Sequence, residues 1–418
     1  MTKSVCSGIA AWTLLTLISL PSRATELLKV GCPWTSSAVN EQTHNFGFPD
    51  THANYVLALL PTNPTPDTTI TISGSYPQVR YFSFQIDDGS GFDNLVDQLP
   101  DADLIPVEGG TPDSNPAALP DTGGYSYHYR ITVRFEDAPA QREPNTLYAG
   151  ATQDAYSKKI LFRLYLPNPG VNAAGGVPLP TLTYDGPWGH VDLDQTPDGR
   201  RCTIIDERYG NIHQLPAFFA VSSRVPRFKP VYSIQSVPFP NADAHYLRSA
   251  PGESYADMVV VRAKTPTTPA LPPAVVADPD VRYWSICQNG LSSGAVFGCL
   301  ADTEVVTQSD GYFVTVISPP DKRPAEATAD QGYNWLPWGD ESDALVALRQ
   351  ILPNPAFPGD YEHAIAAKFL EPISQSLGVW APEITYCDAA TFSANAAAGG
   401  ETLIQACRAA YLASYRKQ

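Results

Sequence analysis

The stretch VRYFSFQ at residues 79–85 decides how the rest of the chain is interpreted, because VRYWSIC follows at residues 281–287. A second shared phrase lies downstream of each copy, RLYLPNP at 163–169 and RQILPNP at 349–355. The alternation of side chains along these phrases predicts β-strands. A repeat on this scale indicates two related modules in one chain.

Two further landmarks recur in the same order. GYSYHYRITVRF at 124–135 is answered by GYFVTVI at 311–317, and ILFRLYL at 160–166 by LVALRQIL at 345–352. The 40 prolines and 29 glycines are spread between these apolar segments. This distribution is typical of a mainly β protein with many turns.

The predicted architecture is two tandem β-sandwich, jelly-roll-like modules related by internal duplication. The chain of 418 residues suits two domains. The predicted divisions are a signal peptide at 1–24, a first module at 25–190, a connector at 191–250, a second module at 251–358 and a helical, disulfide-stapled tail at 359–418.

The composition excludes some classes of partner. The formal net charge is −16, and a surface this acidic repels phosphate backbones and anionic lipids. We therefore expect no nucleic-acid partner. The N-terminus has the pattern of a secretory signal, with Lys3, an apolar run at 9–20 and a small-x-small ending at 22–24. The mature protein is predicted to be secreted or periplasmic, without a membrane span.

The cysteines support export. Cys6 lies in the signal peptide, which leaves six cysteines, and an even number in an exported protein favours disulfides. Their spacing favours the pairs Cys287–Cys299, Cys387–Cys407 and Cys32–Cys202. No C-x-x-C motif is present, which disfavours zinc and thioredoxin-like chemistry.

These residues also resemble a known family. RYWS at 282–285, GYF at 311–313, NWLP at 334–337 and LR at 348–349 resemble the motifs of a jelly-roll domain of unknown function found in many bacterial proteins. The whole chain is similar to secreted bacterial hypothetical proteins that carry this domain in both halves. The first half departs from the pattern, with NTLY at 145–148 in place of NWLP. The resemblance implies a β-sandwich and no particular activity.

Several patterns are candidates for chemistry. GLSSG at 290–294 matches the nucleophile-elbow motif, but its position in a short loop between cysteines favours a plain turn. The repeated arginines are Arg80 and Arg163 with Arg282 and Arg349. They either cross-link strands or loop carbonyls within their own module, or face a pocket and bind a carboxylate. Their recurrence favours the structural role.

The chain also contains candidates for metal and acid/base sites. Asp87, Asp88 and Asp93 are weak candidates for a calcium site. The alternative is that they form an acidic turn exposed to solvent. His44, Asp50 and His52 are the candidate catalytic residues, against the simpler interpretation that Asp50 caps a turn. We expect no cofactor.

The aromatic loop that follows NWLP is the candidate ligand site. Trp335, Trp338 and Asp340 combine rings for stacking with a carboxylate for hydroxyls, and Tyr283 is grouped with them. The alternative is that the tryptophans plug the sandwich core.

The sequence therefore predicts an exported protein that binds a small organic or glycan-like ligand. Two alternatives remain open. One is a hydrolase, lyase or isomerase with an acid/base site between the modules, and the other is a structural envelope protein.

Overall fold

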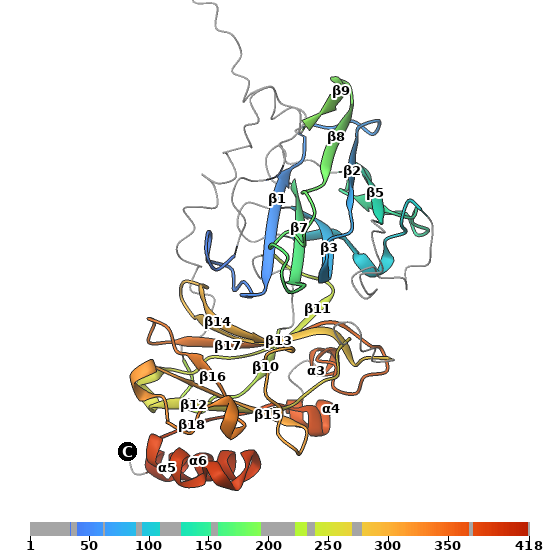
Figure 1. Cartoon of the computed structure of the whole chain (residues 1–418). Helices are drawn as coiled ribbons and strands as arrows, with labels where there is room; N and C mark the ends of the chain where they lie inside the picture. The colour runs from blue at the N-terminus through green and yellow to red at the C-terminus, as the bar shows by residue number, and fades with distance from the viewer. Residues whose placement is uncertain are drawn as a thin grey trace, which may run out of the picture.

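The computed structural model describes Trp34 and residues 40–61, 63–88, 94–108, 127–151, 158–193, 222–231, 239–269, 278–367 and 371–416. The chain forms two β-sandwiches stacked end to end, as Figure 1 shows, with the C-terminal helices at the far end of the second. The predicted signal peptide and the Cys32–Cys202 pair lie outside the described residues.

The first module packs an inner sheet of four strands against an outer sheet of five. The inner sheet has the order β1 (Ala53–Leu59), β7 (Lys158–Pro167), β3 (Val79–Asp88), β4 (Asn94–Pro100). The outer sheet has the order β6 (Thr146–Tyr148), β5 (His128–Arg134), β2 (Thr69–Ser75), β8 (Thr181–Gly186), β9 (Gly189–Asp192). Side chains such as Ile72, Phe84 and Phe162 fill the space between the sheets. Alternating strand residues thus supply the core of the sandwich.

The second module repeats this plan. Its inner sheet has the order β10 (Lys229–Pro230), β11 (Ala244–Ser249), β17 (Ala344–Pro353), β13 (Val281–Gly290), β14 (Val296–Ala301). Its outer sheet has the order β16 (Asn334–Pro337), β15 (Tyr312–Ser318), β12 (Met258–Lys264), β18 (Glu383–Cys387). In both modules the short strand β6 or β16 pairs in parallel, and the other strand pairs are antiparallel.

The duplication extends to irregular backbone features. The ladder between β3 and β4 shifts register between Ile86 and Asp87, and the ladder between β13 and β14 shifts at the matching Gln288 and Asn289. Leu166 and Leu352, at matching places near the ends of β7 and β17, have φ of 49° and 45°. Positive φ is uncommon for a leucine, so its occurrence in both copies confirms the duplication.

The structure reveals two further recurring phrases, which the sequence analysis does not predict. FPDTHA at 48–53 leads into β1 and FPNADA at 239–244 leads into β11. LTYD at 182–185 and ITYC at 384–387 form β8 and β18. Strands therefore lie in segments predicted as connector and as helical tail, and these strands complete the second sandwich.

Helices cover the outer face of the second module. The α-helices are α3 (Glu362–Ala366), α4 (Ile373–Leu377), α5 (Ala389–Asn395) and α6 (Gly400–Tyr415), and 3-10 turns are η1 (Asp101–Asp103), η5 (Glu253–Tyr255), η6 (Pro320–Lys322), η7 (Ala329–Gln331), η8 (Gly378–Trp380) and η9 (Ala396–Ala398). Phe392 and Leu403 pack on the outer sheet beside Val260 and Val314. The disulfide Cys387–Cys407 joins β18 to α6, as predicted.

The second predicted disulfide is also present. Cys287 and Cys299 lie opposite each other on β13 and β14, with their Cα atoms 4.1 Å apart. Among the described residues, no helix is long and apolar enough to cross a membrane.

Side chains of the two inner sheets meet in one cluster, so that the sandwiches share a buried interface. Tyr81, Leu161 and Tyr165 of the first module meet Tyr283 and Ile351 of the second. In Figure 1 the strands β1, β7 and β3 run toward the second module, whose inner sheet lies across their lower ends, and its outer sheet and the helices α5 and α6 follow beyond.

Candidate binding site between the modules

Reciprocal ion pairs cross the interface. Arg80 on β3 reaches Asp302 of the second module at 2.9 Å, and Arg282 on β13 reaches Asp101 of the first module at 2.9 Å. Arg80 and Arg282 occupy the same position in the repeat, and so do Asp101 and Asp302. Exchange of matching contacts is what a two-fold axis produces, so the modules pack like the two halves of a symmetric dimer.

The second pair of repeated arginines follows the same rule. Arg349 on β17 hydrogen-bonds Asp50 and, at 3.2 Å, the carbonyl of Phe48. Arg163 on β7 donates to the carbonyls of Phe239 and Pro240, each at 2.6 Å. Each arginine therefore holds the loop before β1 or β11 of the other module. The predicted structural role is present, but most of the partners lie across the module interface, and Arg163 also bonds Gln85 of its own module.

Asp50 is the centre of the contact made by Arg349. Its side chain is completely buried, and one carboxylate oxygen accepts from the Tyr283 hydroxyl at 2.9 Å and from Ser285 Oγ at 2.6 Å. Burial alone would raise the pKa of Asp50, but the Arg349 guanidinium and the hydrogen bonds from His52 and Ser285 hold that pKa well below its usual range. Asp50 is therefore an ionised structural anchor.

His52 lies between two carboxylates. Its Nδ1 is 3.2 Å from Asp50 and its Nε2 is 3.0 Å from Glu304. Burial would lower the pKa of His52, but these hydrogen bonds and charges raise it to about 10. A histidine that stays protonated at neutral pH does not accept a proton from a substrate. The structure thus brings Asp50 and His52 together as an ion pair, while His44 is half-buried earlier in the same loop.

The matching loop of the second module has different chemistry. Asn241 and Asp243 take the places of Asp50 and His52. The Tyr81 hydroxyl donates to Asp243 at 2.7 Å, and Gln98 donates to Asn241 at 2.8 Å. Arg163 here has a further acceptor in Gln85, whereas the position equivalent to Gln85 in the second module is a disulfide cysteine.

Asp50 also lies near both sulfur atoms of the Cys287–Cys299 disulfide, within the spacing of a metal site. Thiolates are the metal ligands that cysteine supplies, and the disulfide removes both of them. This group is therefore not a metal site while the bond is intact.

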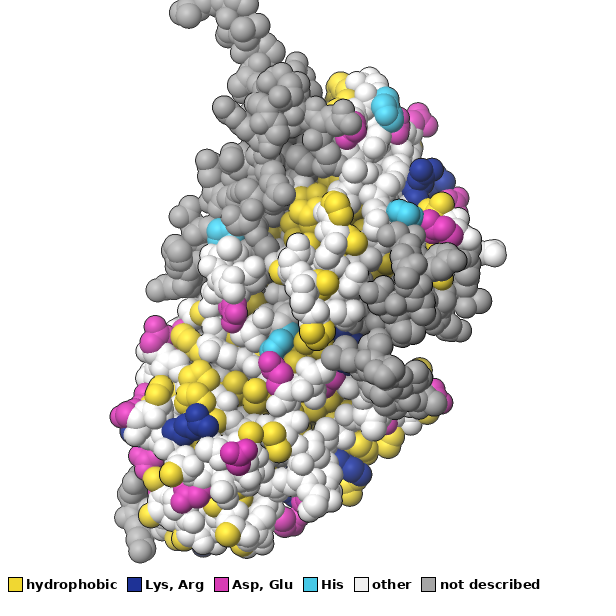
Figure 2. Space-filling model, viewed as in Figure 1, with side chains coloured by type: hydrophobic (Ala, Val, Ile, Leu, Met, Phe, Trp, Pro, Cys, Tyr) yellow, Lys and Arg dark blue, Asp and Glu magenta, His cyan; other side chains and the backbone are white. Residues whose placement is uncertain are grey.

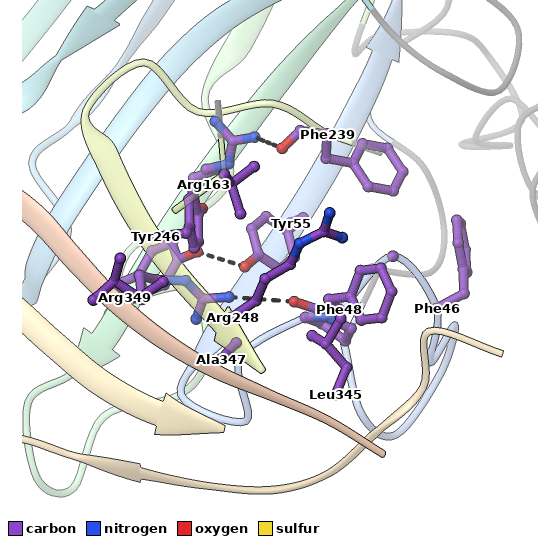
Figure 3. Close-up of a pocket in the computed structure, with 15 residues that line it drawn as sticks. Phe46, Phe48, Tyr55, Arg163, Phe239, Tyr246, Arg248, Leu345, Ala347 and Arg349 are labelled. Atoms are coloured by element: carbon purple, nitrogen blue, oxygen red, sulfur yellow. Dashed lines mark hydrogen bonds between the residues drawn. The ribbon is translucent and has the colours of Figure 1, made fainter. Parts of the chain in front are cut away.

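A cavity opens where the two loops meet β1, β7, β11 and β17. Its empty volume is about 770 Å³, including solvent at its mouth. The residues that line it, most of which Figure 3 labels, are Phe46, Gly47, Phe48, Pro49, Tyr55, Arg163, Tyr165, Val231, Phe239, Tyr246, Leu247, Arg248, Leu345, Ala347 and Arg349. Six of them are aromatic, three are arginines, and none is acidic.

Arg248 is the third arginine of the cavity. It is half-buried on β11, and its guanidinium lies among the rings of Tyr55, Phe48 and Phe239 in Figure 3. Burial lowers the pKa of Arg248. A guanidinium in apolar surroundings is stabilised by a bound anion.

The predicted ligand residues do not gather at this cavity. Trp338 is only 1% exposed in the core of the second module, and its Nε1 donates to the Glu341 carbonyl at 2.9 Å. Arg323 covers the ring of the half-buried Trp335, and Asp340 is exposed. Tyr283 is buried in the contact with Asp50. For Trp338 the structure thus shows the alternative, in which the side chain fills the core of the sandwich.

The other motifs also have structural roles. GLSSG turns between the antiparallel strands β13 and β14, and Ser292 Oγ donates to Glu341 at 2.6 Å, so this loop is not a strand–helix nucleophile elbow. Asp87 is buried opposite Lys159 in the β3–β7 ladder, and Asp88 lies opposite Lys158. Cations beside these carboxylates disfavour calcium, and Asp93 lies outside the described residues.

Comparison with known proteins gives weak structural likenesses and no family. No protein-family model matches the sequence, and no curated protein matches it. The chain is similar to an uncharacterised protein from Burkholderia cenocepacia, with a TM-score of 0.48 and 13% identity over 79% of this chain and 81% of that chain. It is also similar to the VPA0106 protein from Vibrio parahaemolyticus, with a TM-score of 0.35 and 11% identity over 75% of this chain and 88% of that chain. These likenesses transfer no function.

Proposed function

We propose that this protein is exported and binds a small organic anion in the cavity between its modules. The observation that carries the proposal is the lining of the cavity, which combines aromatic rings with arginines and contains no carboxylate. The ligand would place an apolar or aromatic body among the rings and a carboxylate or similar anionic group on Arg248.

Charge favours an anion in this cavity. The protein as a whole carries a net charge of −16, and the face in Figure 2 shows more acidic than basic side chains. Against this background the Arg248 guanidinium, in a cavity lined by no carboxylate, attracts an anion, because the apolar walls strengthen the electrostatic attraction.

Ring contacts supply the rest of the expected affinity. Phe46 and Phe239 meet with their ring centroids 5.7 Å apart, and Phe48 completes this side of the cavity. Flat apolar bodies bind well between such rings. A glycan needs acceptors for its hydroxyls, and the side chains that line this cavity provide neither carboxylates nor amides. An organic anion is therefore the better fit of the two ligand classes.

Two disulfides support the exported location, because such bonds persist in oxidising compartments. The acid/base alternative gains no support from Asp50 and His52, since Asp50 is buried against Arg349 and His52 is held protonated between two carboxylates.

The test is a calorimetric titration of the oxidised protein with 2-naphthoate and with its neutral counterpart, 2-naphthylmethanol. We expect saturable binding of the acid and binding at least roughly tenfold weaker for the alcohol, as removal of a buried charged hydrogen bond predicts. Arg248→Gln should remove this preference, whereas Arg130→Gln, on the exposed face of β5 in the outer sheet of the first module, should keep it. Equal binding of both compounds, or an unchanged preference in Arg248→Gln, would contradict the proposal.

A further inference from the structure

The strand β18 lies at the edge of the outer sheet of the second module and pairs there with β12. The matching strand of the first module, β8, pairs on its outer side with β9, where Tyr184 lies opposite Val191. β8 and β18 occupy the same position, because they pair antiparallel with the equivalent strands β2 and β12. Within the described residues, no strand lies beside the outer edge of β18.

The path of the chain explains this difference. After β8 the chain turns back through residues 186–189 and forms β9. After β18 it enters α5, whose first turn is capped by the Asp388 side chain accepting from the Thr391 amide at 2.7 Å. Among the described strands, this edge of β18 is therefore open, and an open edge presents backbone N–H and C=O groups to an added strand.

A groove runs along this edge. Pro382, Glu383, Ile384 and Thr385 form one side of it, and the segment 225–230 forms another. Residues from the start of α4 and from α6 complete it, and its empty volume is about 1630 Å³ including open solvent. The groove thus gives an extended segment access to the β18 backbone.

The groove offers both apolar contacts and positive charge. Along the segment 225–230, Phe228 is buried in the core, while Arg227 and Lys229 point to solvent and line the groove. In the described part of the chain neither of these two cations forms an ion pair. Glu383 on the strand side is already neutralised by Arg408 at 2.7 Å.

The rest of the lining is mixed. Ile373 and Leu412 supply apolar side chains together with Ile384, and Glu371 adds a second carboxylate just before α4. A strand presents its side chains alternately to opposite faces. A segment that alternates acidic and apolar residues would therefore meet the cations with one set and the apolar side chains with the other.

We propose that this groove binds an extended peptide segment with alternating acidic and apolar side chains, added as an antiparallel strand to β18. Strand addition of this kind takes its affinity from backbone hydrogen bonds and its specificity from alternate side chains. The added segment takes the place that β9 occupies in the first module.

The probe is a capped, fluorescein-labelled hexapeptide of alternating glutamate and valine, followed by fluorescence anisotropy with the whole oxidised protein. We expect saturable binding that is at least roughly tenfold weaker for the lysine–valine counterpart, because two attractive pairs become repulsive. Two N-methylated versions, one for each set of alternate amides, distinguish strand addition from charge alone. We expect one of them to lose at least about tenfold, since it cannot donate to the β18 edge.

The protein variant Arg227→Glu with Lys229→Glu should weaken binding by roughly tenfold, because both positions are exposed and the substitutions reverse their charge. Arg130→Gln, on the exposed face of β5 in the first module, is the matched control and should bind the peptide normally. Failure of the hexapeptide to bind, or equal binding of the lysine and both N-methylated peptides, would overturn the proposal. A concentration-dependent dimer in sedimentation that the double variant dissociates would overturn it in favour of a second copy of the chain.

Discussion

Replacing Asp50 by alanine tests the contact that joins the modules. Asp50 is completely buried and Arg349 nearly so, and the substitution leaves the guanidinium with the Phe48 carbonyl as its remaining acceptor from that loop. Loss of one partner of a buried ion pair costs about 3–5 kcal/mol, because the other charge stays uncompensated. We expect this loss in the free energy of unfolding at pH 7, measured by urea titration with tryptophan fluorescence.

The second copy of the repeat supplies the control. Asn241 occupies the position of Asp50 and accepts from Gln98 at 2.8 Å and from the Asp243 amide at 3.0 Å, but it carries no charge. Asn241→Ala should therefore cost only about 1–3 kcal/mol, the range for a buried neutral group that loses its partner. A cost for Asp50→Ala no larger than that for Asn241→Ala would refute the assignment of Asp50 as a charged anchor.

Three further predictions concern the same framework. Since the pKa of His52 is raised to about 10, its stabilising effect is complete below the unfolded value of 6.5 and is lost as the pH rises to 10. The free energy of unfolding of the wild type, measured by urea titration, should therefore fall between pH 7 and 10 by up to about 1.4 kcal/mol per pH unit. His52→Gln should flatten this slope. A double-mutant cycle of Arg80→Ala and Asp302→Ala should give a coupling above about 1 kcal/mol, because these side chains are 6% and 3% exposed, and a value near zero would contradict the cross-module pair. Replacing Cys387 and Cys407 by alanine should lower the free energy of unfolding by about 3 kcal/mol, as expected for a loop of this length. Hydrogen exchange should become faster in α6 while it stays slow in the inner sheets. Unchanged exchange in α6 would contradict a stabilising role for this disulfide.

Much of the fold could be predicted because both modules contain the same sequence motifs in the same order. The phrases at 79–85 and 281–287 became β3 and β13, paired in matching register with β7 and β17. The strand β18 was missed because its match to β8 is only four residues long and lies in an Ala-rich tail. A short match of this kind is visible only once the order of strands in the sheets is known.

The site was harder to predict because its parts are about two hundred residues apart in the sequence. Asp50 meets Arg349 and Arg80 meets Asp302 across the module interface, and no spacing within the chain encodes those contacts. Arg248 lay in a segment interpreted as connector, since β11 resembles β1 only weakly. The signals that pointed to this region were the candidate residues His44, Asp50 and His52 in the loop before β1 and the repeated Arg163 and Arg349; the duplicated Phe-Pro turn before β1 and β11 is a further signal.

The most direct test of the account is a crystal structure of the oxidised protein with 2-naphthoate. We predict the naphthalene ring between Phe46, Phe48 and Phe239, with the carboxylate within hydrogen-bond distance of the Arg248 guanidinium. A saturated crystal with the cavity empty, or with the acid bound elsewhere, would contradict the claim that the module interface is the binding site.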